Sequence, residues 1–254
     1  MSLELSADSV RKLDESIQRL ADAAGETVKS VLPAQMRLFA KDLAFNTEPV
    51  GDSAGAQKKK GEDAVESKIR SIYITIGEAV NLLKDSNPKL VFPFERALKK
   101  KNFPQCAALL MQISGRKNSY SVGPFDGGLL HKSQRFKKRV RNQLVVTNEN
   151  AIKQYITKTK KSVGFAKGGF ASAARDLGGV RDIPQFATRH KGAQGSGAVD
   201  GDGKTLSVVM TNGVKYIRQA LDSSKENKAL EFRKKSIDLV LERMATRKFS
   251  SAMK

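Results

Sequence analysis

The apolar residues of the first 43 positions recur every three or four residues, which restricts how this part of the chain can fold. The periodic residues are Val10, Leu13, Ile17, Leu20, Ala24, Val28, Val31, Met36, Phe39 and Leu43. This spacing is typical of an amphipathic helix, whose apolar side has to be covered. Pro33 has no N–H and crowds the preceding turn, so we expect two helical pieces, at 7–31 and 33–45.

The last part of this stripe, formed by Met36, Phe39 and Leu43, is a candidate oligomer face. A helix with one apolar stripe buries it either inside its own chain or against another subunit. Packing into the core is the simpler explanation of the same pattern, and the sequence leaves both interpretations open.

The rest of the chain alternates between short strand-like and helical patterns. The segment KIRSIYITI, at 68–76, is rich in β-formers and predicts a strand. Further strands are expected at 144–146 and 205–210, and helices at 78–114, 149–158, 163–177, 214–221 and beyond 225. We therefore expect one α+β domain over residues 1–254, with a small antiparallel sheet covered by a long N-terminal helix and a C-terminal helix.

Three segments have the composition of long loops. Residues 46–61 (NTEPVGDSAGAQKKKG) combine Pro, Gly and Ser with three consecutive lysines. Residues 115–141 carry four glycines and a proline ahead of a basic cluster, and residues 191–203 are rich in glycine. None of the three shows the apolar periodicity of a buried element, so we expect extended basic and glycine-rich loops.

The chain is strongly basic, with 46 Lys and Arg against 26 Asp and Glu and a formal net charge of +20. Polyanions are therefore the first candidates for partners. The densest basic segment is the candidate polyanion or partner contact, formed by Lys132, Arg135, Lys137, Lys138, Arg139 and Arg141. Phe136 is the sole aromatic residue inside it, so sequence readout is not indicated. Contact with DNA, contact with an acidic protein and a solvated loop all remain open.

Cys106 is the only cysteine, which excludes an intrachain disulfide and indicates synthesis in a reducing cytoplasm. The beginning, MSLELSADSV, has neither a basic leader nor an apolar core. The apolar run from Cys106 to Met111 is far shorter than the ~20 residues that span a bilayer. We expect neither export nor membrane insertion.

The residues that could support catalysis do not combine into a site. Gly203-Lys204-Thr205 imitates the end of a phosphate-binding loop, but Ala198 stands where that loop needs glycine, and a strand-like segment follows instead of a helix. The chain has only two histidines, both expected at the surface, so a zinc site is not indicated. Cys106 lies in an apolar run, where a thiol is normally inert, so a cysteine nucleophile is not indicated either. We expect no enzyme activity, no cofactor and no metal, and we expect Cys106 in the core.

Several segments together suggest a family. They are a long N-terminal helix, AFNTEPVG, GEDAVESKIRSIY, KKSVGFAKGGFASAARDLGG, IPQFATRH, NGVKYIRQAL and a basic C-terminal helix. In this order they resemble neck and tail-completion proteins of tailed bacteriophages. The resemblance covers both ends of the chain and the helix near its middle, whereas residues 77–141 have no counterpart. It assigns Asn212, Tyr216 and the helix after Lys225 to the end of the shared core.

The resemblance implies a structural protein of the virion, made in the host cytoplasm and located in the neck. Such a protein would form a ring, a hexamer or a dodecamer, that contacts the portal or adaptor and the tail tube or sheath, and it could face packaged DNA. The resemblance brings no catalytic residues. The alternative is a basic protein that binds nucleic acid without sequence specificity, for which the charge is equally good evidence.

Overall fold

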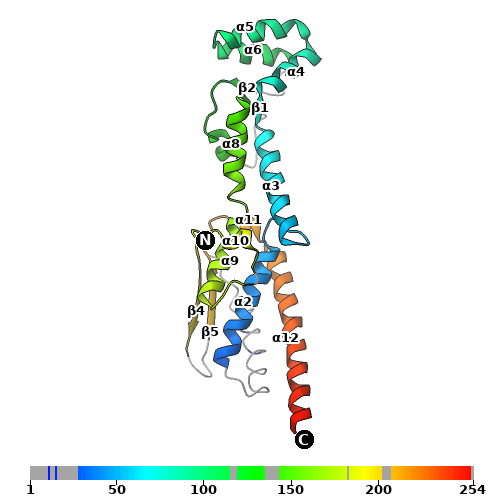
Figure 1. Ribbon diagram of the computed structural model, residues 1–254, viewed down its shortest axis with the longest axis vertical. Coiled ribbons are helices and arrows are strands. Elements are labelled where there is room, and N and C mark those ends of the chain that lie inside the picture. Colours follow the sequence, from blue (N-terminus) through cyan, green and yellow to red (C-terminus); the bar gives the residue numbers. More distant parts are fainter. Residues whose placement is uncertain are drawn as a thin grey trace. The chain divides into compact units, whose positions relative to one another are not determined.

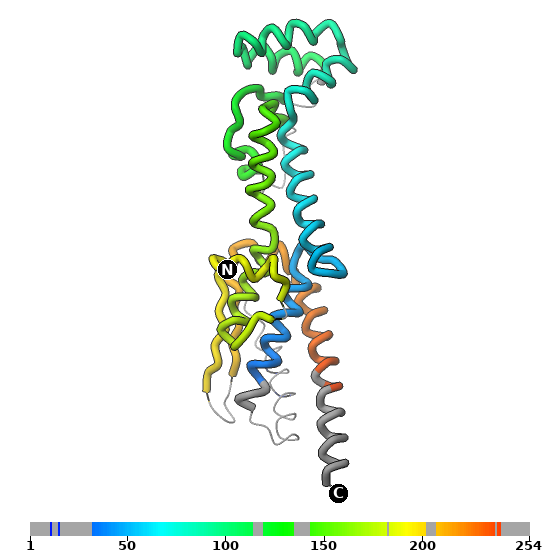
Figure 2. Tube along the Cα trace, viewed as in Figure 1, coloured from blue at the N-terminus to red at the C-terminus, as the bar shows by residue number. Residues whose placement is uncertain are grey.

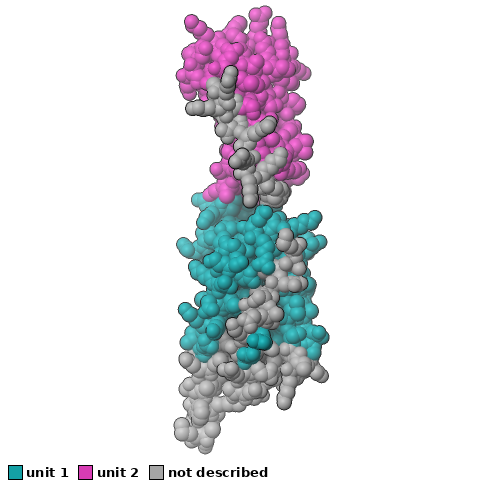
Figure 3. All heavy atoms as spheres, turned by 180° about the vertical axis from the view of Figure 1, so that it is seen from behind, with its two compact units in different colours: residues 1–61, 162–254 teal, residues 62–161 magenta. Residues whose placement is uncertain are grey.

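The computed structural model describes residues 28–114, 119–134, 143–181, 183–201 and 207–252, together with Arg11 and Glu15. It mixes helices and strands, with 64% of residues in helices and 13% in strands, so helices carry most of the packing. The contacts gather in two compact units (Figure 3). Unit 1 comprises Met1–Gly61 and Ser162–Lys254, and unit 2 comprises Glu62–Lys161. Unit 1 thus combines segments from both ends of the sequence, and in Figure 2 its early (blue) and late (orange) described segments lie side by side.

Unit 1 is built around two helices, α2 (Val28–Asn46) and α9 (Phe165–Asp176) (Figure 1). An antiparallel hairpin of β4 (Gly195–Asp200) and β5 (Ser207–Asn212) packs on α9, in a register that pairs Gly195 with Asn212. The remaining elements are α10 (Gln185–Thr188), α11 (Ile217–Ala220) and α12 (Ser223–Ala252), and α12 packs along α2.

Pro33 lies within α2, so the break expected there is absent. The proline removes one hydrogen bond of the helix, but Leu32 and Met36 on either side of it pack in one continuous core, which favours a continuous helix. The first predicted helical piece, 7–31, lies largely outside the described residues.

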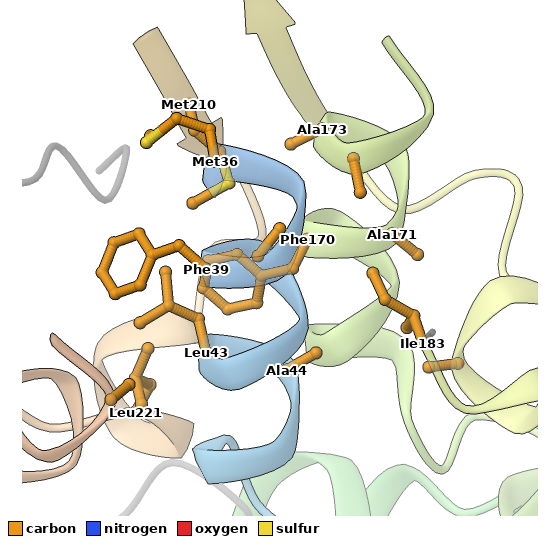
Figure 4. Close-up of a cluster of buried hydrophobic side chains, with 14 of the residues drawn as sticks. Met36, Phe39, Leu43, Ala44, Phe170, Ala171, Ala173, Ile183, Met210 and Leu221 are labelled. Carbon is orange, nitrogen blue, oxygen red and sulfur yellow. The ribbon is translucent and has the colours of Figure 1, made fainter. Parts of the chain in front are cut away.

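The core of unit 1 takes in the whole C-terminal part of the apolar stripe (Figure 4). Met36, Phe39 and Leu43 are each at most 1% exposed and pack with Phe170 of α9 and Met210 of β5. The structure thus uses the candidate oligomer face as core, which leaves no apolar area there for a neighbour.

Glycines allow α9 and β4 to approach each other at backbone distance. A Cβ on Gly195 would lie 1.9 Å from the carbonyl oxygen of Gly169, and a Cβ on Gly197 would lie 2.5 Å from that of Ala173. These distances are shorter than any side chain tolerates, so the glycine-rich segment is a packed strand and not a linker.

Unit 2 contains a three-stranded parallel sheet in the order β1-β3-β2. The strands are β1 (Tyr73–Thr75), β2 (Ser119–Val122) and β3 (Gln143–Thr147). Its helices are the greater part of α3 (Ala54–Arg70), then α4 (Ile76–Ser86), η1 (Pro88–Leu90), α5 (Val91–Lys99), α6 (Phe103–Ser114), α7 (Leu129–Gln134) and α8 (Glu149–Lys160). One apolar cluster joins the sheet to α4, α5 and α6, and a second joins it to α3 and α8.

Several expectations need correction. Among the described strands, only those of the hairpin are antiparallel, because the crossovers through α4–α6 and α7 bring the strands of unit 2 together in parallel. The expected loops contain regular structure: α3 begins inside 46–61, β2 and α7 lie inside 115–141, and β4 lies inside 191–203. Of the predicted strand 68–76, residues 68–70 are the end of α3, and β1 takes up only 73–75. The single domain over 1–254 stays a prediction, to be weighed against the division into two units.

Candidate functional site

The described part of the basic cluster is a single residue. Lys132 is exposed on α7, whereas Arg135, Lys137, Lys138, Arg139 and Arg141 lie outside the described residues. Their role as a polyanion or partner contact therefore stays a prediction. Within the described ranges, no helix combines the length and apolarity that crossing a membrane requires, and no group of His, Cys, Asp or Glu side chains is placed to hold a metal ion.

Cys106 lies in the core of unit 2, which confirms the expectation for this residue. Its side chain is fully buried in α6, and burial raises the pKa of the thiol above its usual value. A thiol that stays protonated in an apolar environment is a poor nucleophile.

His131 is buried as well, which corrects the expectation of a surface residue. Its Nδ1 lies 3.0 Å from the hydroxyl of Tyr155, and its backbone N–H donates to the hydroxyl of Tyr73 at 3.3 Å. The Tyr73 hydroxyl in turn donates to Oδ1 of Asp126 at 2.8 Å, and burial together with this hydrogen bond raises the pKa of Tyr73. Asp126 also accepts from the backbone N–H of Leu130.

These groups form hydrogen bonds with one another around the turn that precedes α7. Phe125 packs between the rings of Tyr73 and Tyr155, with centroids 5.1 and 5.3 Å away. A buried polar network of this kind fixes the conformation of a loop. We interpret the network as the device that attaches this turn to the sheet of unit 2.

The most unusual side chain of unit 1 is Lys167, which is fully buried in α9. Its Nζ donates to the carbonyl oxygen of Ala44 at 2.6 Å and to Oε1 of Gln57 at 3.0 Å. Burial lowers the pKa of this amine to about 7, while the negative charge of Glu48 acts in the opposite direction. No carboxylate within the described residues forms an ion pair with Lys167.

Hydrogen bonds and one ion pair hold the NTEPVG segment and Gln57 in place. Thr47 donates its hydroxyl to the carbonyl oxygen of Leu43, and Gln57 donates its Nε2 to the carbonyl oxygen of Gly51. Glu48 pairs with Lys225 of α12 at 2.8 Å. Segments that are more than 100 residues apart in the sequence therefore meet at one amine.

Sequence reasoning missed Lys167, although a signal was present. Lys167 stands four residues after Val163 and three before Phe170. The apolar residues that recur at helical spacing here are Val163, Ala166, Phe170, Ala173, Ala174 and Leu177. That spacing places a lysine on the buried side of the helix. A charged residue inside an apolar face deserves to be considered as a buried group.

Asn212 also has a structural explanation. It is fully buried at the end of β5, where its Nδ2 donates to the carbonyl oxygen of Ala166 at 2.9 Å and its Oδ1 accepts from the N–H of Val214 at 3.1 Å. It therefore connects the hairpin to α9. Tyr216 is half-buried beside the same core.

The hairpin of unit 1 is open at its two outer edges among the described residues. It has two strands only, so among the described residues no third strand pairs with either outer edge. Neither strand contains Lys, Arg or Pro, the residues that commonly protect sheet edges, and Asp200 is the one charged residue in them. Ala198 and Val209, which pair across the strands, are both exposed.

Comparisons of this chain with protein-family models, with curated proteins and with solved structures found no match. Function therefore has to be argued from the arrangement of the residues themselves.

Proposed function

We propose that this chain is a structural virion protein of a tailed bacteriophage, part of the neck or tail-completion ring that joins the portal and head to the tail. The supporting observation is the composition of unit 1. AFNTEPVG precedes GFAKGGFASAARDLGG, IPQFATRH and NGVKYIRQAL by more than 100 residues, yet all four segments belong to this one unit, whereas GEDAVESKIRSIY lies in unit 2 apart from Gly61. Residues 77–141, for which the resemblance gave no counterpart, belong to unit 2.

The unprotected hairpin supports assembly through unit 1. β5 contains no charged residue, and an edge strand of this kind pairs readily with a strand of another subunit. Repeated around an axis, such a contact from one chain to the next closes a ring. The proposed partners are further copies of the chain, in a hexamer or dodecamer, then the portal or adaptor and the tail tube or sheath.

The native mass of the nuclease-treated chain in high salt tests this proposal. We expect a closed oligomer at micromolar or higher concentration. Ala198→Lys combined with Val209→Lys should shift the mass to the monomer, because lysines on the hairpin oppose pairing between subunits. Asn81→Lys, on the exposed side of α4, is the matched control and should leave the oligomer intact. A wild-type chain that stays monomeric throughout would contradict a ring formed by this chain alone.

The alternative function is a basic protein that binds nucleic acid without sequence specificity. The distribution of charge supports this alternative, because unit 2 holds 20 of the 46 basic side chains but only 8 of the 26 acidic ones. If this is the purpose of the chain, affinity for DNA should fall by orders of magnitude between low and physiological salt. Charge reversal of Lys137, Lys138 and Arg139 should then abolish binding and leave oligomerisation unchanged.

A further inference from the structure

Among the described residues of unit 2, the largest exposed apolar side chain stands among basic residues. Phe92, near the start of α5, is 72% exposed, although an aromatic ring of this size is normally covered. The opposite side of the same helix is fully buried, with Phe94 and Ala97 in the cluster shared with α4 and α6. The position of Phe92 on the outside is thus fixed by the packing of its neighbours.

The outward face of η1 and α5 carries five basic residues around Phe92. They are Lys89, Arg96, Lys99, Lys100 and Lys101, all exposed. Phe92, Arg96 and Lys99 follow at helical spacing and share the centre of the face. Glu95 is the one acidic residue between 88 and 101, and none of the five basic groups forms an ion pair with a described residue. We call these six residues the α5 face.

Lys101 occupies a backbone position that does not favour lysine. Its φ is 55°, in the left-handed region just after the end of α5, where glycine is the usual residue. A lysine at this position costs folding stability, so packing does not explain it. The three consecutive lysines do complement the dipole of α5, but that effect accounts for neither Phe92 nor Lys89.

We propose that the α5 face binds double-stranded DNA. Unpaired lysines and arginines on an exposed helix gain most from phosphates, because each contact releases a condensed counterion. The DNA major groove, about 12 Å wide, admits a helix, and a phenylalanine can contact thymine methyl groups or wedge against a base step. Phe92 and its basic neighbours together fit a partner that is anionic and also offers an apolar surface. The inference does not depend on ring formation.

The experiment measures binding of the full-length, nuclease-treated chain to a labelled mixed-sequence DNA duplex between roughly 50 and 200 mM NaCl. Arg96→Gln with Lys99→Gln and Lys100→Gln should weaken binding tens to about 100-fold near 150 mM and reduce the salt slope by about 2 to 3. The matched control removes three exposed lysines of α12 in unit 1, Lys228, Lys234 and Lys235, by the same change to Gln. It alters the net charge equally and should weaken binding less than about threefold.

Phe92→Ser separates the apolar contact from the charge. It should weaken binding several-fold and leave the salt slope unchanged, because no counterion is released by an aromatic ring. Circular dichroism checks that each variant is folded.

Three results would overturn the proposal. The first is a wild-type chain that does not bind the duplex. The second is an equal loss of DNA affinity in the two triple variants. The third is an unchanged affinity in both the α5 triple variant and Phe92→Ser, while charge reversal of Lys137, Lys138 and Arg139 abolishes binding. Each of these leaves the native mass, and with it the ring proposal, unaffected.

Discussion

The buried amine of Lys167 makes the stability of unit 1 depend on pH in an unusual direction. An unfolded lysine titrates near its ordinary value of 10.5, whereas the folded one titrates at about 7. Between these values the unfolded state binds more protons, so the free energy of unfolding rises with pH. The rise is at most about 1.4 kcal/mol per pH unit, or about 3 kcal/mol from pH 7 to 9.5. Below pH 7 the contribution is flat, because both states are protonated.

Lys167→Met should abolish this rise. The variant has no amine to deprotonate, but it leaves the carbonyl oxygen of Ala44 and Oε1 of Gln57 without their donor, at about 1 to 3 kcal/mol each. We therefore expect the stability difference between wild type and Lys167→Met to grow by about 3 kcal/mol as pH rises from 7 to 9.5. Urea unfolding at each pH gives this difference, and other titrating groups cancel because both proteins contain them.

A direct titration completes the test. In carbon NMR of labelled lysine side chains, one Cε resonance should have its midpoint near pH 7 and should be missing in Lys167→Met. Glu48→Gln should move that midpoint lower, because the carboxylate of Glu48 favours the charged amine. Lys191→Met, at an exposed position, should leave both readouts unchanged. Parallel stability profiles for wild type and Lys167→Met would refute the reasoning.

Three further substitutions test the packing. The Nε of buried Arg233 lies 2.8 Å from Oδ2 of Asp42. Asp42→Ala leaves this guanidinium without its partner and should destabilise unit 1 by about 3 to 5 kcal/mol in urea unfolding. A loss of stability below ~1 kcal/mol would contradict this. Gly169→Ala should lower the free energy of unfolding by about 1 to 3 kcal/mol, since its Cβ would lie 2.1 Å from the side-chain amide oxygen of Asn212. Gly179→Ala is the control. Its Cβ would meet nothing within 4 Å, so its stability should be unchanged. Lys101→Gly should raise the melting temperature by relieving about 1 kcal/mol of left-handed strain, and an unchanged or lower value would disprove that strain.

Elements with strong periodicity could be predicted from the sequence. The helix expected at 163–177 is α9 at Phe165–Asp176, and the helix expected at 149–158 is α8 at Glu149–Lys160. The strand expected at 205–210 overlaps β5 at Ser207–Asn212. In each case the local pattern of apolar residues coincides with the face that the tertiary structure buries.

The hidden strand β4 shows why the remainder could not be predicted. The segment GSGAVD has little β-propensity, and it is a strand because β5 pairs with it and because its glycines fit against α9. The spacing of α9 indicates that Lys167 is buried, but its hydrogen-bond partners, Ala44 and Gln57, are over 100 residues away and could not be predicted. Information of this kind lies in the partner segment, which a local pattern does not contain.

The insertion of unit 2 into unit 1 leads to a last prediction. A Cβ on Gly61 would lie 2.6 Å from Cγ1 of Val163, so the two ends that flank unit 2 are neighbours within unit 1. Closing a short loop between neighbouring ends costs little entropy. Replacing residues 62–161 by a short Gly-Ser linker should therefore leave unit 1 folded. The resonance of Lys167 with its midpoint near pH 7 reports this, because the shift requires the buried environment.

The control for this deletion is the same shortened chain with Lys167→Met, which should lack that resonance. A second control deletes residues 162–254 instead, which removes α9 and should leave α2 without a core. If the shortened chain aggregates or all of its lysines titrate near 10.5, unit 1 depends on unit 2 for folding. The chain would then be the single domain that the sequence predicts, and the proposed ring surface could not be studied apart from unit 2.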